Sequence, residues 1–169
     1  DWTPVGLDLR AGRFPLQVEK HMLNMTGRLL PGVSTVTINA RYYNVHALVA
    51  LEATARGLEW TDTLSLFRRV EVVFGAASLV NANPIVSSPH GSGVIEPRLG
   101  SGSVDVDALS TPKVGYSDAE RGFWGPYVGS EVTLGLVDPA DPTRTGPRRD
   151  DAAIRSGLHG LIGLAEQSE

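Results

Sequence analysis

The chain contains no cysteine among its 169 residues. This absence excludes disulfide frameworks, zinc ribbons, iron–sulfur clusters and thiol nucleophiles. It fits a reducing compartment, so we expect a cytoplasmic protein. Lysine is scarce as well, because only Lys20 and Lys113 stand among the 15 basic residues. Together with 19 glycines and many alanines, this bias towards arginine indicates a bacterial genome rich in G and C.

Long hydrophobic runs are also missing. The longest, around VHALVALEA, is interrupted at Glu52 and falls short of the roughly 18–20 residues that a membrane-spanning helix needs. The net charge of −4 disfavours a protein that coats nucleic acid. With 41% hydrophobic residues, the chain can bury the core of one domain. Because it starts at Asp1 and ends in an apolar run, we expect this domain (residues 1–169) to belong to a longer protein or complex.

The first part of the chain, residues 15–82, has the spacing of a helical bundle. Apolar residues recur on one helix face after Pro15, and Pro31-Gly32 ends that helix. VSTVTIN, residues 33–39, alternates like a short strand or an extended linker. A second helix is predicted from about Asn39 to Arg56, with Gly57 at the left-handed position that commonly follows a helix.

A third helix is predicted to begin at a cap formed by Thr61 or Asp62. Its connection to the second helix is about four residues long, which predicts an antiparallel helix hairpin. The second helix is apolar almost all round and should therefore be enclosed. The expected fold class is mainly α: a helical bundle with a helix hairpin, a Gly/Pro-rich loop region and a small β element.

Residues 83–149 read as a loop-rich segment. They are rich in Gly, Ser and Pro, and only SVDVDAL (residues 103–109) alternates like a strand. The apolar run after GFWGPY fits a helix or a strand. A terminal helix is predicted over residues 150–169, capped by Asp150 or Asp151. Its Gly157, Gly160 and Gly163 suit either close packing against a neighbour or a poorly formed helix.

One cluster of polar residues falls on the predicted hairpin. Tyr42 and His46 are four residues apart, so the phenol and the imidazole lie on one helix face. Antiparallel pairing would bring Glu52 near Arg68 or Arg69, which predicts an ion pair. Such a cluster could be an acid–base site. The favoured interpretation is that these groups satisfy one another inside the bundle.

Two further groups could carry chemistry in the loop-rich segment. His90 lies in PHGSG, but the strand–Gly-x-Ser-x-Gly–helix elbow of a hydrolase is missing, and a loop without a catalytic role is the favoured interpretation. Asp105 and Asp107 would share one face of a strand and could hold Mg²⁺ or Mn²⁺ with Glu96. Carboxylates on the wet face of an edge strand are the commoner case. We therefore expect no cofactor.

GFWGPY places three aromatic residues, Phe123, Trp124 and Tyr127, between glycines. Exposed, they could stack on nucleic-acid bases or anchor a protein partner. Buried, they would pin the loop to the helices. Burial is favoured, because aromatics make up only 7% of the chain and most must serve the core.

The stretch LLPGVSTVTINARYY, residues 29–43, carries a Leu-Pro-Gly-x-Ser-Thr run that leads into Ala-Arg-Tyr. It resembles a signature of a bacterial family of unknown function whose members are often associated with phage-defence or restriction gene clusters. The matching residues are Leu30, Pro31, Gly32, Ser34, Thr35, Ala40, Arg41 and Tyr42. Asn44 and His46 depart from the pattern, where aromatic or aliphatic residues would be expected. The resemblance implies no catalytic residues.

Arg41 falls in the first turn of the second helix, where the helix dipole disfavours a cation. We therefore expect Arg41 to have an anionic partner, either a carboxylate or a phosphate.

The leading hypothesis is a non-enzymatic interaction or scaffold module in nucleic-acid defence, whose partners are other subunits or the remainder of a longer chain and not a membrane. A first alternative is a nucleic-acid-binding module that uses Arg41, Arg68, Arg69 and the GFWGPY aromatics. A second is a metal-dependent hydrolase centred on His90, Asp105 and Asp107.

Overall fold

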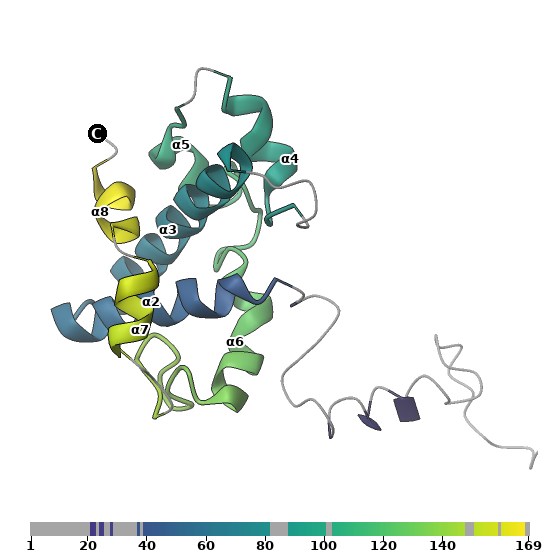
Figure 1. The fold of residues 1–169 in the computed structure, drawn as a ribbon, viewed down its shortest axis with the longest axis vertical. Coiled ribbons are helices and arrows are strands. Elements are labelled where there is room, and N and C mark those ends of the chain that lie inside the picture. The colour runs from purple at the N-terminus through teal and green to yellow at the C-terminus, as the bar shows by residue number, and fades with distance from the viewer. Residues whose placement is uncertain are drawn as a thin grey trace, which may run out of the picture.

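Two long helices form the centre of the protein (Figure 1). The computed structural model describes residues 21–22, 24–25, 28, 37, 39–81, 88–100, 103–147, 151–158 and 160–167. Helix α2 spans Arg41–Arg56 and α3 spans Trp60–Val80. The fold is mainly helical, as the sequence predicts; among the described residues, the β structure is an isolated bridge between Val137 and Thr145. The predicted first helix and the VSTVTIN strand lie largely outside the described residues.

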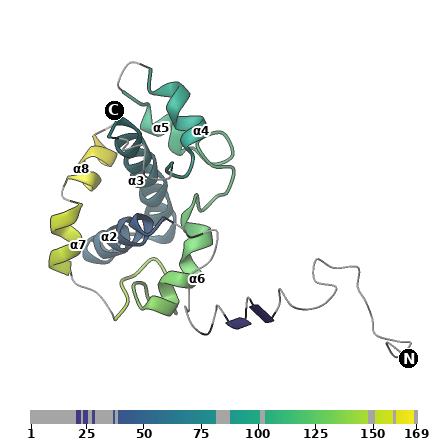
Figure 2. The same ribbon diagram turned by 45° about the vertical axis from the view of Figure 1, so that its right-hand side comes forward.

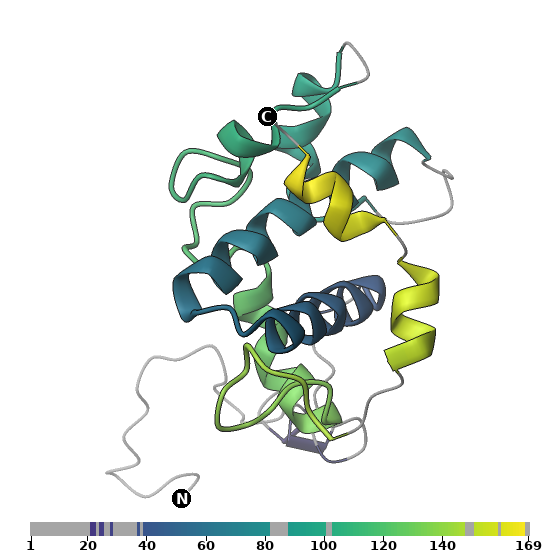
Figure 3. The same cartoon turned by 90° about the vertical axis from the view of Figure 1, so that its left-hand side faces the viewer.

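The connection between α2 and α3 is built as the sequence predicts. Gly57 adopts a left-handed conformation, with φ 64° and ψ 34°. The backbone N–H of Leu58 then donates to the carbonyl of Ala53 at 3.0 Å, which closes the end of α2. The two helices diverge from this connection as the arms of a V (Figure 3). The predicted cap of α3 is wrong, because the capping position is Glu59, ahead of Thr61 and Asp62.

The remaining helices surround this hairpin (Figure 2). Helix α3 contacts α2 and three short helices: α4 (Ser92–Ile95), α5 (Val106–Ser110) and α8 (Leu161–Glu166). Helix α2 contacts α6 (Trp124–Leu134) and α7 (Asp151–Gly157). One cluster of buried apolar side chains runs through these contacts, with Val49, Phe67, Val70, Ile95 and Trp124 among its most enclosed members.

The described part of the 83–115 segment contains short helices. Helix α4 continues into a 3₁₀ turn, η1, at Glu96–Arg98. The strand predicted at SVDVDAL is wrong, because residues 106–110 form α5. Its N-cap Asp105 accepts a hydrogen bond from the backbone N–H of Ala108 at 2.9 Å. An aspartate that caps a helix overrides the alternation of the valines.

The apolar run after GFWGPY continues α6, which begins inside that motif at Trp124 and ends at Leu134, and the predicted terminal helix consists of two pieces. Gly160 has a φ of 84° and separates α7 from α8. No described helix is both long enough and apolar enough to span a bilayer.

The C-terminal end of α2 is completed by a distant arginine. Arg144 donates to the carbonyls of Ala53 at 2.8 Å and Leu58 at 2.7 Å. The backbone N–H of Thr145 also donates to the hydroxyl of Thr54 at 3.2 Å. A cation suits this position, because the carbonyls at the end of a helix carry partial negative charge. The segment after α6 is thereby attached to the hairpin.

Candidate functional site

A histidine lies between two glutamates in the middle of the core. His46 of α2 contacts Glu71 of α3 through Nε2, at 2.9 Å from Oε1. It contacts Glu131 of α6 through Nδ1, at 2.6 Å from Oε1. All three side chains are almost completely inaccessible to solvent. We call His46, Glu71 and Glu131 the buried triad; it joins the three helices α2, α3 and α6.

The second oxygen of each carboxylate also accepts hydrogen bonds. Oε2 of Glu71 accepts from the hydroxyl of Tyr116 and from the backbone N–H of Phe123, the latter at 3.0 Å. Oε2 of Glu131 accepts from the indole N–H of Trp124 at 3.1 Å. In these contacts the phenol, the backbone N–H and the indole N–H donate, so Oε2 of each glutamate is an acceptor.

The hydrogen-bond partners of His46 favour its charged form. A neutral imidazole has one donor and one acceptor nitrogen, whereas both nitrogens of His46 face carboxylate oxygens. An imidazolium satisfies both contacts. Burial by itself would lower the pKa of His46, but Glu131 and Glu71 outweigh burial and raise this pKa to about 9. Burial also raises the pKa of the Glu131 carboxyl, against the opposing effect of His46.

Gly122 allows the backbone to approach this triad. It has a φ of 57°, and a Cβ built on it would lie 2.5 Å from Oε2 of Glu71 and even closer to the hydroxyl of Tyr116. Only glycine fits there without displacing one of these groups.

We therefore expect Gly122→Ala to lower the free energy of unfolding by about 2–4 kcal/mol, because it combines backbone strain with overpacking. Denaturant unfolding followed by circular dichroism measures this change. The control is Gly129→Ala, since a Cβ at Gly129 meets no atom within 4 Å and alanine is favoured inside a helix. Equal stability of the two variants would contradict the close approach.

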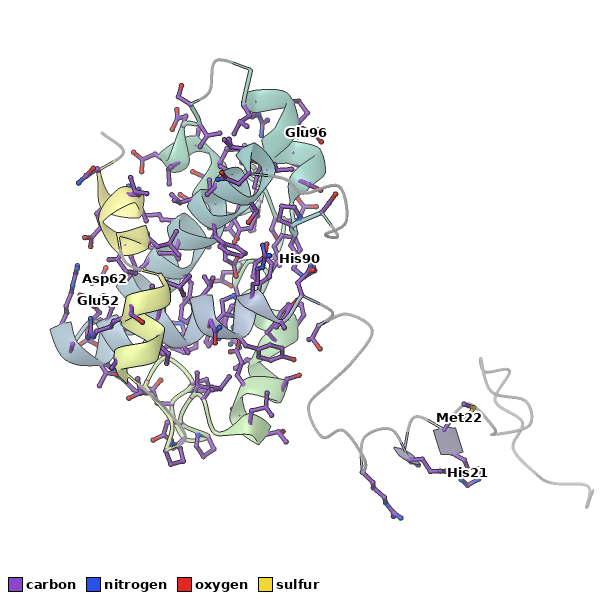
Figure 4. All side chains as sticks on the ribbon, viewed as in Figure 1. His21, Met22, Glu52, Asp62, His90 and Glu96 are labelled. Carbon is purple, nitrogen blue, oxygen red and sulfur yellow. The ribbon has the colours of Figure 1, made fainter. Side chains whose placement is uncertain are left out.

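A second set of polar contacts, next to the triad, joins His90 to Tyr42 and Tyr127. The hydroxyl of Tyr42 accepts from the backbone N–H of His90 at 3.0 Å, so Tyr42 packs beside the ring of His46 without bonding to it. The Nε2 of His90 contacts the hydroxyl of Tyr127 at 2.9 Å. Burial lowers the pKa of His90 and raises that of Tyr127 to about 12. Figure 4 shows His90 beside the first turn of α2.

The aromatic residues of GFWGPY are directed inwards, as favoured from the sequence. Trp124 and Tyr127 are fully buried. Trp124 stacks on Phe67 with ring centroids 4.6 Å apart, and Phe123 stacks on His90 at 4.5 Å. Trp124 and Tyr127 therefore offer no free face for a nucleic-acid base, and Phe123 is half-buried against His90.

Arg68 is buried, and it has no carboxylate partner among the residues that the structure describes. Its guanidinium donates to five backbone carbonyls, those of Ser110, Thr111, Ser117, Ala119 and Glu120. It also lies 4.9 Å from the ring centroid of Tyr116. Arg68 therefore supports the whole segment between α5 and α6. Its positive charge and that of His46 balance the negative charges of Glu71 and Glu131 in the core.

The predicted ion pair between Glu52 and Arg68 or Arg69 is wrong. Glu52 accepts from Arg56 at 2.6 Å and from Arg155 of α7 at 3.2 Å. Arg69 pairs with Asp107 and donates to the carbonyl of Ala165 at 2.7 Å. The V shape of the hairpin explains the difference, because the two helices separate and face different neighbours. In Figure 4, Glu52 lies on the side of the molecule that α7 occupies.

The two aspartates predicted to share a metal face have separate structural roles. Asp105 caps α5 and Asp107 pairs with Arg69. Within the part of the chain that the structure describes, no group of three His, Asp or Glu residues is arranged to hold a metal ion. The geometry therefore gives no support to a metal centre formed by His90, Asp105 and Asp107.

Arg41 does not have the predicted carboxylate partner among the described residues. Its side chain is exposed in the first turn of α2, and that turn contains no acidic residue. The site residues therefore divide into two groups. Tyr42, His46, Arg68, Trp124 and Tyr127 are used inside the core, whereas Arg41 remains at the surface.

Glu71, Glu131 and Tyr116 are the important residues that the sequence reasoning missed. Glu71 and Glu131 each stand in an apolar helical run, VEVVF and SEVTL. A single carboxylate on an apolar helix face is the available signal, since it must find a partner when buried. Comparison of the chain with family models, with curated proteins and with solved structures gives no match.

Proposed function

We propose that this chain is a non-enzymatic protein-interaction module whose partner docks on an exposed tryptophan–arginine pair. The pair consists of Trp60, at the start of α3, and Arg121, just before α6. The guanidinium carbon of Arg121 lies 5.2 Å from the ring centroid of Trp60. We call these two residues the Trp60–Arg121 surface.

The exposure of Trp60 is the observation that carries this proposal. Of its surface, 41% is accessible, in contrast to the complete burial of Trp124 beside it. Tryptophan and arginine are the residue types that most often dominate binding energy at protein interfaces. A tryptophan held by a neighbouring ring and a guanidinium is already ordered, so binding it costs little side-chain entropy.

The charge of Arg121 indicates the chemistry of the partner. Among the described residues, Arg121 has no carboxylate within ion-pair distance, and its guanidinium lies over the rings of Trp60 and Trp124. A partner protein that presents a carboxylate next to an apolar side chain would satisfy the guanidinium and cover the indole. Beside this surface, a pocket of about 420 Å³ has Thr61 and Glu120 in its lining and offers further contact area.

The burial of the reactive groups supports a non-enzymatic function. The buried triad is satisfied by internal partners, and no triad residue lines either the 420 Å³ pocket or a second pocket formed by Arg56, Asp62 and Arg69. Base stacking by Trp124 and Tyr127 would require unfolding of the core, and the guanidinium of Arg68 is already bonded to backbone carbonyls. The setting in bacterial nucleic-acid defence rests on the resemblance of residues 29–43 to the defence-associated family.

The first experiment captures the partner by crosslinking it to position 60. A photo-crosslinking amino acid is placed at Trp60 in cells that express the full protein, and the same amino acid at Val114 serves as control, because Val114 is more exposed but has no arginine over it. Crosslinked products are identified by mass spectrometry. We expect a partner that is captured from position 60 and not from position 114.

The second experiment measures affinity for the purified partner. Trp60→Ala and Arg121→Gln should each weaken binding about tenfold or more, whereas Arg98→Gln, at an exposed arginine of η1, should leave it unchanged. Isothermal titration with variants of wild-type melting temperature tests this. Equal affinity of all four proteins, or equal crosslinking from both positions, would refute the proposal.

A further inference from the structure

The buried triad connects α6 to the hairpin, beside the stacking of Trp124 on Phe67 and the hydrogen bonds of Arg68 to the segment before α6. Glu131 belongs to α6, and Glu71 accepts from Tyr116 and Phe123, which lie in the segment before α6. His46 is the only group that touches both glutamates among the described residues. Tyr116 and Phe123 thus contact Glu71 of α3 directly, whereas the charged contact of α6 with the hairpin passes through Nδ1 of His46.

We propose that a proton held on His46 helps attach α6 to the α2–α3 hairpin, so that α6 loosens when the proton is lost. Without it, one nitrogen of His46 becomes an acceptor that faces a carboxylate oxygen at hydrogen-bond distance. One of the two contacts is then repulsive. The core also keeps two negative charges against the single positive charge of Arg68.

The charged and titratable groups that face the triad are compatible with a proton on His46. Tyr42 and Tyr127 present neutral phenols whose ring centroids lie 5.7 and 5.5 Å from that of His46. Burial raises the pKa of Tyr42 and of Tyr116. His90 is the neighbouring base, and burial lowers its pKa. The charged and titratable groups around His46 are Tyr42 on α2, Arg68 and Glu71 on α3, His90 before α4, Tyr116 before α6, and Tyr127 and Glu131 on α6.

The direction of the pH dependence follows from the two pKa values of His46. Its pKa is about 9 in the folded protein and 6.5 in the reference state. The stabilisation is therefore complete below pH 6.5 and is lost as the pH rises from 6.5 to 9. Between these values the folding equilibrium constant should fall by up to about tenfold per pH unit. Tyrosines of the unfolded chain, with a reference pKa of 10.0, titrate above this window.

Nuclear magnetic resonance of the imidazole nitrogens tests the proposal on the unaltered protein. We expect both nitrogens of His46 to be protonated at pH 7.5, with a titration midpoint above pH 8. In Glu131→Gln the midpoint should fall by at least one pH unit. His90, in the same spectra, should titrate below the ordinary histidine range and serves as the internal control.

Stability and hydrogen exchange provide the second test. The denaturant midpoint should fall from pH 7 to pH 9 in the wild type and in His90→Gln. Amide exchange, corrected for its intrinsic pH dependence, should speed up in α6 before α3. A neutral His46 at pH 7.5, or a stability that stays flat across this window in both proteins, would overturn the proposal. These measurements need no partner, so their outcome is independent of the Trp60–Arg121 surface.

Discussion

Replacing Arg68 by methionine is expected to lower the free energy of unfolding by about 3–5 kcal/mol. Methionine fills much of the same volume but donates no hydrogen bond. It therefore leaves five backbone carbonyls of the 110–120 segment without the donor that the guanidinium supplies. It also removes a buried positive charge beside Glu71. Chemical denaturation followed by circular dichroism measures the loss.

Two comparisons isolate the cause of this effect. Arg98→Met changes the same chemistry at an exposed position and should alter stability by no more than about 0.5 kcal/mol. Arg68→Lys keeps the charge but presents a compact ammonium in place of a planar fork, so it should fall between the wild type and Arg68→Met. A methionine variant as stable as the wild type would show that the carbonyls do not depend on Arg68.

His46→Leu should be at least as damaging, with a loss of about 3–5 kcal/mol. Leucine leaves Glu71 and Glu131 buried without the cation that both contact. The matched control is His90→Leu, which removes a half-buried imidazole that pairs with a phenol and should cost about 1 kcal/mol. Thermal and denaturant unfolding of the two variants gives the comparison.

Two compensating substitutions show whether the stability lost in His46→Leu comes from unpaired charge or from lost packing. In the triple variant His46→Leu, Glu71→Gln, Glu131→Gln, the carboxylates are replaced by neutral amides of similar shape. If charge causes the damage, the triple variant should be more stable than His46→Leu alone, because replacing a complete buried ionic group is far cheaper than removing one partner. A triple variant less stable than the single one would assign the loss to packing.

Local features of the hairpin could be predicted from the sequence. The apolar periodicity of α2, the left-handed glycine at Gly57 and the short connection to α3 depend on neighbouring residues. The interior positions of His46 and Trp124 also follow from apolar surroundings. These are short-range effects, in which the local sequence determines the backbone.

The partners of the polar groups could not be predicted, because they come from segments far along the chain. The sequence predicts the wrong arginine as the partner of Glu52. The angle between α2 and α3 decides this partner, and it depends on the packing of α5, α6 and α8. The strand expected at SVDVDAL failed for a local reason, because the capping hydrogen bond of Asp105 competes with the alternation of the valines. The exposure of Trp60 likewise depends on tertiary packing.

The long-range polar contacts of α2 determine at what stage of synthesis this helix acquires all of its polar partners. Glu131 contacts His46 across 85 residues of sequence, Arg144 contacts Ala53 across 91 and Arg155 contacts Glu52 across 103. When only the hairpin has left the ribosome, the polar groups of α2 therefore lack the partners that later segments supply. Contacts this distant in sequence form late. The hairpin thus leaves the ribosome before the groups that stabilise it, and a nascent chain that stops before α6 exposes His46 with one carboxylate of its pair.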